Sequence, residues 1–421
     1  MKTKSRNEII QHLYSLTARG VKFGLEKISD ASARLGNPHL ACPSVHVAGT
    51  NGKGTTCACI ESILRHYGKK TGLFLSPHLV EFEERFLING KPVPPESWLD
   101  IYRGIEDCIE ELDLTFFEVT TLIAFELFRR ENVDWAIYEV GMGGRLDATN
   151  IIKPRISAIT HIDLDHEAFL GTDLVSIAAE KLGIVKPETP VVMLDSGNSD
   201  VIRVAQKRCR ENLAPLTLIS PSSAHAVTDS NTSTLFVYKC QPYSIQLKGK
   251  HQVSNAMLAL ETAHLLGFSE NVIIAEALKN VFMPARFQIV KYKGKTLVFD
   301  AAHNPGAIHA LVSTLKSKFE NRGICIVAGI LSDKNFVAMI TALCTIAVQL
   351  ILTSPHTDRG AGIAALKESL PDEWKEKAIE RETVARAMDE ALSSSAPVVC
   401  CTGSFYTVGE AMQHLGIQPY G

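Results

Sequence analysis

Residues 44–67 read SVHVAGTNGKGTTCACIESILRHY, and this stretch decides the fold. The pattern predicts a short apolar strand over 44–48, a glycine-rich loop over 49–56 and a helix that runs to about Tyr67. A loop that joins a strand to a helix N-terminus aims backbone N–H groups at a bound anion, and the helix dipole adds positive charge there. The stretch therefore predicts a phosphate-binding loop at the end of a parallel strand.

The loop itself supplies the candidate nucleotide ligands. Lys53 is expected to reach the β- and γ-phosphates, and Thr55 or Thr56 to contact Mg²⁺. The spacing departs from GxxxxGK[ST], because Gly54 separates Lys53 from Thr55. The alternative is a glycine-rich turn with a surface lysine, but the strand before the loop and the helix after it favour phosphate binding. The candidate residues of the loop are Gly49, Thr50, Asn51, Gly52, Lys53, Gly54, Thr55 and Thr56.

Short apolar runs alternate with amphipathic helical stretches over most of the chain. The expected strands after the first are 72–75, 135–140, 156–162 and 190–194, then 296–301, 323–329, 348–354 and 396–403. Such alternation is typical of parallel sheets covered on both faces. Between the two series, residues 213–247 predict a small antiparallel insertion, followed by a helix over 255–266.

Pro284 interrupts the helical pattern at residues 283–288, which marks a boundary between two units. The sequence thus predicts an α/β protein with two domains. Residues 1–288 would form a P-loop-containing, doubly wound, mostly parallel sheet domain, and residues 289–421 a smaller Rossmann-like α/β domain. We expect the ligand to bind in the cleft between them.

Composition narrows the class of protein. The 421 residues are 46% hydrophobic and 21% charged, with a net charge of −3, which argues against a general polyanion-binding surface. The ten cysteines include no CxxC pair, and no window approaches 18 consecutive apolar residues. The N-terminus lacks the apolar core of a signal peptide. We therefore expect a cytoplasmic protein that binds neither nucleic acid nor membranes.

Polar residues follow several predicted strands at their carboxyl ends. Ser76 follows the second strand, Glu139 ends the third, and Asp165 and His166 lie beyond the fourth. In an open parallel sheet these ends converge on one crevice, where a hydroxyl, a carboxylate and an imidazole beside phosphates could hold Mg²⁺. Imidazole is an unusual magnesium ligand, so His166 could instead orient a water. Taken singly, the three side chains could be a turn cap, an ion-pair partner and a hydrogen-bonded loop residue.

Further candidates lie on later segments. Lys181 sits on an apolar helical stretch that points back to the crevice, where it is either a snorkelling lysine or a buried cation that needs a partner. Asp300 and His303 follow a strand of the second unit, and Arg286 precedes that unit, from where a guanidinium could stabilise transferring phosphoryl charge. Asn255, at a predicted helix, could donate to a nucleotide or serve as a helix-terminal amide. Ser332, Asp333, Lys334 and Ser404 also follow strands.

Taken together, the motifs resemble the folylpolyglutamate synthases, more narrowly the bifunctional dihydrofolate synthase/folylpolyglutamate synthase branch of the Mur ligase superfamily. They are, in chain order, GTNGKGTT, SPHLVEFEERFLING, TFFEVTTLIAFELF, EVGMGGRLDATN, DLDHEAFLG, IAAEKLGIVK, HQVSNA, PARFQ, DAAHNPGA and TGSFYTVGE. The resemblance covers about residues 20 to 410. It implies an ATP- and Mg²⁺-dependent ligase that phosphorylates a substrate carboxylate and lets the amine of L-glutamate displace the phosphate.

The resemblance also implies roles for individual residues. Ser76, Glu139 and His166, with Thr55, match the positions that hold one or two Mg²⁺ ions. Asn255, Arg286 and Asp300 match nucleotide-binding positions, and His303 lies near the reacting centre. Lys181 matches a lysine that the family carbamylates. Lys53, Lys181, Arg286 and His303 are thus the catalytic candidates, and the pterin side would comprise Phe23, Gly24, Thr115, Phe116, Phe117, Glu118, Leu146, Asp147 and Ala148.

The expected substrates are dihydropteroate or reduced folates together with L-glutamate, and the family pattern implies a monomer. Three alternatives stay open: a Mur-type ligase with another carboxylate acceptor, a folylpolyglutamate synthase without dihydrofolate synthase activity, and a P-loop ATPase that acts on a partner protein. The last leaves the DAAHNP and TGSFYTV loops of the second unit without a task.

Overall fold

The computed structural model describes residues 4–20, 24–229, 233–320 and 322–420. Its larger sheet has eight strands in the order β4-β3-β2-β5-β1-β6-β7-β8. These are β1 (Ser44–Ala48), β2 (Thr71–Phe74), β3 (Phe86–Ile88), β4 (Lys91–Pro92), β5 (Trp135–Glu139), β6 (Ile156–Ile159), β7 (Val191–Leu194) and β8 (Leu216–Ile219). The six neighbouring strands β2, β5, β1, β6, β7 and β8 run parallel to one another. Strands β3 and β4 add an antiparallel edge beside β2.

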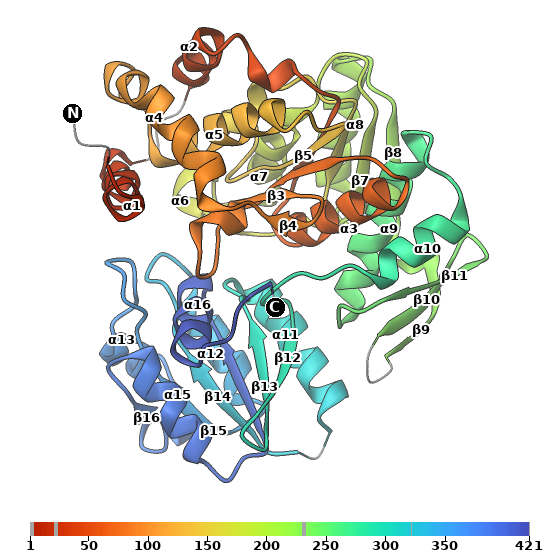
Figure 1. Cartoon of the computed structure of the whole chain (residues 1–421). Helices are drawn as coiled ribbons and strands as arrows, with labels where there is room; N and C mark the ends of the chain where they lie inside the picture. Colours follow the sequence, from red (N-terminus) through yellow and green to blue (C-terminus); the bar gives the residue numbers. More distant parts are fainter. Residues whose placement is uncertain (1–3, 21–23, 230–232, 321, 421) are drawn as a thin grey trace.

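Helices cover both faces of this sheet (Figure 1). One face packs against α3 (Lys53–His66), α9 (Lys250–Leu265) and α10 (Asn271–Lys279). The other packs against α1 (Arg6–Ser15), α2 (Glu26–Arg34), α4 (Pro95–Glu111), α5 (Phe116–Arg130), α7 (Leu174–Lys181) and α8 (Ser199–Glu211). Every residue of β1 is buried, including the polar Ser44 and His46, as expected for a central parallel strand that is covered on both faces.

The region between the two sheets differs from the prediction in two details. A three-stranded antiparallel sheet is present, made of β9 (Ala224–Asp229), β10 (Thr234–Tyr238) and β11 (Gln241–Ile245). The expectation that all of 213–247 is antiparallel is wrong, because β8 pairs parallel to β7 in the main sheet. The helix expected from Asn255 begins at Lys250, because Gly249 turns the chain directly into it with a φ of 102°.

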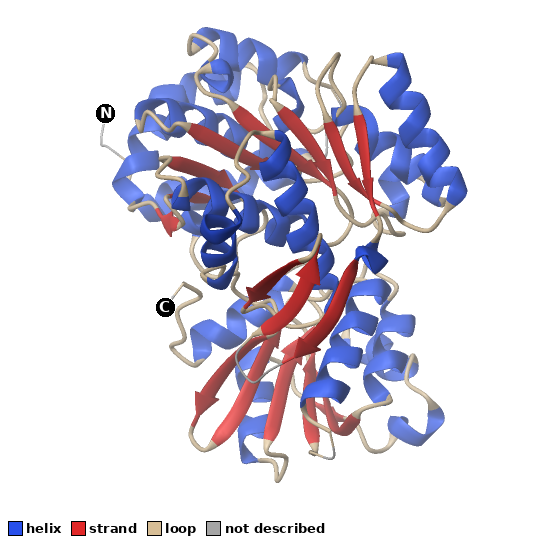
Figure 2. Ribbon diagram, turned by 90° about the vertical axis from the view of Figure 1, so that its right-hand side faces the viewer, coloured by secondary structure: helices blue, strands red, loops and turns tan. Residues whose placement is uncertain are grey.

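The second sheet has six strands in the order β12-β13-β17-β14-β15-β16. It forms the lower part of the molecule in Figure 2, with helices on both of its faces. They are β12 (Gln288–Tyr292), β13 (Lys295–Asp300), β14 (Ile324–Ala328), β15 (Ala347–Leu352), β16 (Ile379–Glu380) and β17 (Val398–Thr402), and all but the edge strand β12 run parallel. The helices are α11 (Pro305–Lys318), α12 (Phe336–Cys344), α13 (Ile363–Glu368), α14 (Asp372–Lys375), α15 (Val384–Ser393) and α16 (Phe405–His414). We keep the domain boundary at 288/289 as a proposal.

The two domains are in close contact. Gly409 of α16 lies against the loop after β2, where a Cβ would come within 2.1 Å of the Leu79 carbonyl oxygen. Beyond α16 the chain returns to the first domain: Ile417 still packs against the second domain, but Tyr420 packs against the core that contains α3 and α9. Among the helices of the described ranges, none is both long and apolar enough to cross a membrane.

Candidate functional site

The phosphate loop lies where β5, β1 and β6 end side by side in the sheet. The Thr50 backbone N–H donates to the His161 carbonyl at 2.8 Å, and its hydroxyl donates to the Asp163 carbonyl at 2.9 Å. Gly49 must lack a side chain, since a Cβ would come within 1.8 Å of Thr160 Oγ1. Gly52, with a φ of 92°, turns the loop into the first turn of α3. These contacts fix the loop against β6 and leave the helix N-terminus facing the crevice.

Ser76, Glu139 and Arg286 line one narrow cavity, with Met283, Phe405 and Tyr420 among its other walls. Glu139 is 4% exposed and accepts a hydrogen bond from the Ser76 backbone N–H at 2.9 Å. Burial raises the pKa of Glu139, while the charge of Lys53, followed by that of Arg286, acts in the opposite direction. The Glu139 carboxylate and the guanidinium of Arg286, which lies in the linker of residues 283–288, thus share a cavity, and the charge of Lys53 acts on the same carboxylate.

The donor set beside Glu139 fits a hard divalent cation. The Gly54 backbone approaches this carboxylate, since a Cβ there would lie 3.7 and 3.8 Å from its two oxygens. Thr55 is 1% exposed, and the buried Thr56 hydroxyl has no partner within the described ranges. Among the described residues, no group of three or more His, Cys, Asp or Glu side chains is arranged so that it could hold a metal ion. One carboxylate with hydroxyl oxygens is what Mg²⁺ uses when phosphates and waters supply its remaining ligands.

Lys181 is the last residue of α7 and is 2% exposed. Its ammonium donates to the Gly49 carbonyl at 2.9 Å, so it reaches the base of the phosphate loop, as its predicted orientation requires. Burial, reinforced by the charge of Lys53, lowers the pKa of Lys181 to about 7. This side chain is therefore a buried amine that is partly neutral near pH 7.

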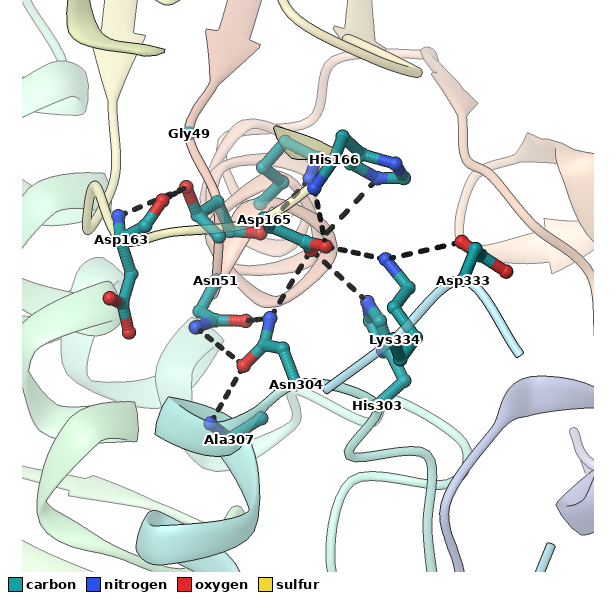
Figure 3. Close-up of polar contacts among 12 residues, drawn as sticks. Gly49, Asn51, Asp163, Asp165, His166, His303, Asn304, Ala307, Asp333 and Lys334 are labelled. Atoms are coloured by element: carbon teal, nitrogen blue, oxygen red, sulfur yellow. Dashed lines mark hydrogen bonds and ion pairs between the residues drawn. The ribbon is translucent and has the colours of Figure 1, made fainter. Parts of the chain in front are cut away.

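Asp165 gathers side chains from both domains (Figure 3). Its carboxylate pairs with the Lys334 ammonium, accepts from Asn304 Nδ2 at 3.3 Å and lies 3.8 Å from His303 Nε2. His166 Nε2 lies 3.9 Å away. Burial raises the pKa of Asp165, but the neighbouring charges of His166, Lys334 and His303 outweigh it and lower the pKa overall.

The same burial acts on the two imidazoles in the opposite sense. It lowers the pKa of both His166 and His303 to about 4, although the Asp165 carboxylate partly offsets the effect. His303 Nδ1 lies 2.9 Å from the Ala301 carbonyl oxygen and so carries the hydrogen. Both rings are therefore neutral at pH 7, as a water-orienting or proton-accepting group requires.

The remaining nucleotide-binding candidates border the loop or the linker. Asn255 packs on Gly52, where a Cβ would come within 2.2 Å of the Asn255 Oδ1, and its amide donates to Gln252 at 3.0 Å. Asp300 accepts from the backbone of Phe287 at 2.8 Å and of Ala302 at 2.9 Å. Burial raises its pKa to about 6 against the charge of Arg286. The Arg286 guanidinium lies over the Phe405 ring at 4.9 Å, so one aromatic ring holds it at the domain junction.

The expected pterin side lies around the start of α5. Thr115 and Glu118 form a capping box, since each side chain accepts from the other's backbone N–H at 3.3 and 2.8 Å. Phe116 stacks on Tyr14 with ring centroids 5.8 Å apart, and Phe117 packs against Gly141.

The remaining pterin candidates flank this helix start. Asp147 accepts from the Thr149 and Met142 backbone N–H groups, both at 3.0 Å, at the start of the short helix Ala148–Ile151. Leu146 is half-buried and Gly24 lies just before α2, whereas Phe23 lies outside the described residues.

Two residues of the site, Asn304 and Tyr420, were not among the sequence candidates, whereas Asp165 and Lys334 were named there for their place after strands. Asn304 exchanges amide hydrogen bonds with Asn51 at 2.9 and 3.3 Å, and Lys334 is 9% exposed against Asp165. Tyr420 reaches the cavity from the far end of the chain. The signal for Asn304, Lys334 and Asp165 was their place at strand ends, whereas nothing in the local pattern distinguishes Tyr420.

Comparison with known proteins agrees with this architecture. Residues 47–263 match the Mur ligase middle domain, and residues 285–405 match the glutamate ligase domain of Mur ligases. The dihydrofolate synthase/folylpolyglutamate synthase of Escherichia coli is 33% identical over 407 residues, which cover 96% of this chain and 94% of that protein. The chain belongs to the dihydrofolate synthase/folylpolyglutamate synthase family of Mur ligases. The Bacillus subtilis enzyme of the same name is 32% identical over 94% of this chain and 96% of that protein.

Solved members of the family share the whole fold. Folylpolyglutamate synthase of Mycobacterium tuberculosis complexed with ADP superimposes with a TM-score of 0.90, at 28% identity over 98% of this chain and 99% of that one. E. coli FolC in complex with DHPP and ADP has a TM-score of 0.84, at 30% identity over 97% of each chain. A Yersinia pestis homologue is complexed with AMPPNP and an Mn ion. The predicted family, fold class and class of enzyme, an ATP-dependent ligase, are confirmed.

Proposed function

We propose that this enzyme joins L-glutamate to dihydropteroate, forming dihydrofolate, and extends folates that already carry glutamate. The observation that carries the proposal is the single cleft in which Glu139 and Ser76 of the first domain face Arg286 of the linker, beside the phosphate loop with Lys53. A phosphate donor held by the larger domain can there meet an amine presented by the smaller one. Family membership supports the substrates.

The reaction proceeds in two displacements. A carboxylate oxygen of the pterin acid attacks the γ-phosphorus of ATP, an O–P bond forms, and ADP leaves. The glutamate nitrogen then attacks the acyl carbon, a C–N bond forms, and phosphate leaves while the amine loses a proton. Lys53 and Arg286 offset the charge on the phosphoryl group in flight, since preorganised cations in a dry cleft stabilise such charge strongly. His303, whose ring is neutral in this environment and lies 3.8 Å from Asp165, is the group that we propose accepts the proton of the amine.

Glu139, Ser76, Thr55 and His166 are the residues that we propose hold Mg²⁺, one ion or two. When bound, the ion supplies charge neutralisation to the phosphate oxygens. The chain's own contribution is to keep the Glu139 carboxylate dry and to fix its orientation through the Ser76 backbone. Asn255, Arg286 and Asp300, with loop residues 49–56, would orient the nucleotide.

Lys181 is proposed to be carbamylated. Its neutral amine attacks the carbon of CO₂, an N–C bond forms, and one proton is released, which turns a buried cation into an anion. The lowered pKa of about 7 supplies the neutral amine that this step needs. Lys181→Ala should lose activity and its response to bicarbonate, and equal activity of both proteins at every bicarbonate concentration would contradict the carbamate.

The pterin ring is proposed to bind between the start of α5 and the loop of residues 146–148, with Gly24 on the side of α2; Phe23, also a pterin candidate, lies outside the described residues. Because Thr115 and Glu118 cap each other, their role would be to hold Phe116 and Phe117 in place rather than to touch the ring. We also propose that the enzyme acts as a monomer in the cytoplasm on small-molecule substrates, since one chain supplies both sides of the cleft.

The test is ADP release with dihydropteroate and L-glutamate together, with the product identified by mass. We expect release to need both substrates, and Lys53→Ala to slow it by about 100-fold or more, while the exposed Lys207→Ala behaves as wild type. Release with a reduced folate but not with dihydropteroate would indicate a folylpolyglutamate synthase only. Release that neither pterin stimulates would favour a ligase for another acid, and turnover without any amide product would favour an ATPase.

A further inference from the structure

Asp165 belongs to the first domain, yet most of its partners come from the second (Figure 3). The Lys334 ammonium pairs with Oδ1, and Asn304 Nδ2 donates to Oδ2 at 3.3 Å. The side chains of Asp165 and Lys334 are each 5% exposed. A carboxylate and an ammonium from different domains therefore bury one another.

Burial distinguishes the Asp165–Lys334 pair from the ion pairs on the surface. A buried charge is costly unless a partner of opposite sign compensates it, and neither residue has this burial when the domains separate. Asn304 follows β13 and Lys334 follows β14, so the Asp165 carboxylate contacts two different loops of the second domain. Nearby, Asp333 pairs with Arg359 at 3.0 Å on the surface, where each side chain is more than 40% exposed.

Contacts around the pair show that the loop of residues 301–306 lies directly against the first domain. Asn304 also exchanges amide hydrogen bonds with Asn51 of the phosphate loop, at 2.9 and 3.3 Å. Gly306, at the start of α11, has no room for a side chain, because a Cβ would come within 2.3 Å of Asp163 Oδ2. The loop that carries His303 is thus held directly against the phosphate loop.

We infer that Asp165 is a positioning residue on which the second domain docks, and that its buried pair with Lys334 sets the distance between the His303 loop and the phosphate loop. This docking of the second domain on the first depends on residues of the chain alone, and it does not depend on which carboxylic acid the enzyme uses as substrate.

Small-angle scattering of the full-length protein tests the docking. A compact chain of this length has a radius of gyration of about 22 Å. Asp165→Asn and Lys334→Met should each raise the radius of gyration, and the double variant should raise it no further, because both changes break one pair. Asp372→Asn, a control in the same domain whose side chain is 96% exposed, should scatter as wild type. Unchanged scattering in both single variants, or a double variant with additive effects, would overturn the inference.

A second variant covers the case in which Asp165→Asn does not fold. Gly306→Val leaves Asp165 and Lys334 unchanged but places a branched side chain where Asp163 lies, so it should also raise the radius of gyration. Circular dichroism of every variant establishes its folding first. Wild-type scattering of Gly306→Val would overturn the close approach on which the inference depends.

Kinetics separate positioning from a general structural role. Turnover should fall about 100-fold in Lys334→Met, since misplacing reacting groups by an ångström costs about that factor. Dihydropteroate affinity, measured by its fluorescence, should stay unchanged, because the proposed pterin site lies wholly in the first domain. Equal losses of affinity and turnover would overturn the positioning role. Absence of dihydropteroate binding in the wild type would contradict the proposed function and leave the scattering test intact.

Discussion

Replacing Lys181 by methionine should stabilise the first domain, by an amount that depends on pH. The pKa of Lys181 falls from 10.5 to about 7 on folding, which corresponds to a cost of about 5 kcal/mol below pH 7. Methionine has a similar length without the charge, but it leaves the Gly49 carbonyl without its donor, a loss of about 1–3 kcal/mol. The net gain in unfolding free energy should therefore be about 2–4 kcal/mol below pH 7.

The sign of the pH dependence follows from proton linkage. Between pH 7 and 10.5 the unfolded chain holds a proton on Lys181 that the folded chain does not, so wild-type stability rises with pH in this window. Methionine does not titrate, so the variant lacks this pH-dependent contribution to stability. The advantage of Lys181→Met should therefore shrink by about 1.4 kcal/mol for each pH unit above 7 and reverse before pH 10.

Urea unfolding in CO₂-free buffers from pH 6.5 to 9.5 measures this difference. Two of the three tryptophans, Trp98 and Trp135, lie in the first domain. A Trp374→Phe background makes the fluorescence report on that domain alone, which matters because the domains can unfold separately. The matched control is Lys207→Met, whose exposed side chain should give no pH-dependent difference. A Lys181→Met difference that is constant across this pH range would refute the reasoning.

The phosphate loop and the start of α5 give three further predictions. Lys53→Ala should lower kcat by about 100-fold or more while circular dichroism stays unchanged, because the half-buried side chain donates to the Thr50 carbonyl of its own loop and is no part of the core; near-normal turnover would remove Lys53 from the mechanism. Gly52→Ala should weaken ADP binding by at least about tenfold in calorimetry, since its Cβ would come within 2.2 Å of Asn255 and its φ is 92°. Thr115→Ala should cost about 1 kcal/mol in urea unfolding through loss of the cap with Glu118, and Thr115→Ser should restore most of it.

Local patterns were sufficient for much of this fold. SVHVA was recognisable as a strand from its valines and its shortness, and the glycines that follow it mark the sharp entry into α3. The helix that carries Asn255 was placed five residues late, because its first turn, KHQV, has too few apolar residues to show a helical period. The position of β8 was missed for a related reason: a short apolar run does not reveal whether its partner strand is parallel or antiparallel.

The sequence by itself determined which residues stand at strand ends and which loop can hold phosphate, because these properties depend on neighbours within a few positions. Only the tertiary structure decided that Asp165 meets Lys334, that Asn51 meets Asn304, and that Tyr420 reaches the cavity beside Glu139. Asp165 and Lys334 are 169 positions apart, and Asn51 and Asn304 are 253 apart. Glu139 and Tyr420, which line the same cavity, are 281 apart (420 − 139). No local propensity encodes such pairs, since they form only when two separately folded sheets bring their carboxyl ends together and exclude water from the charges between them.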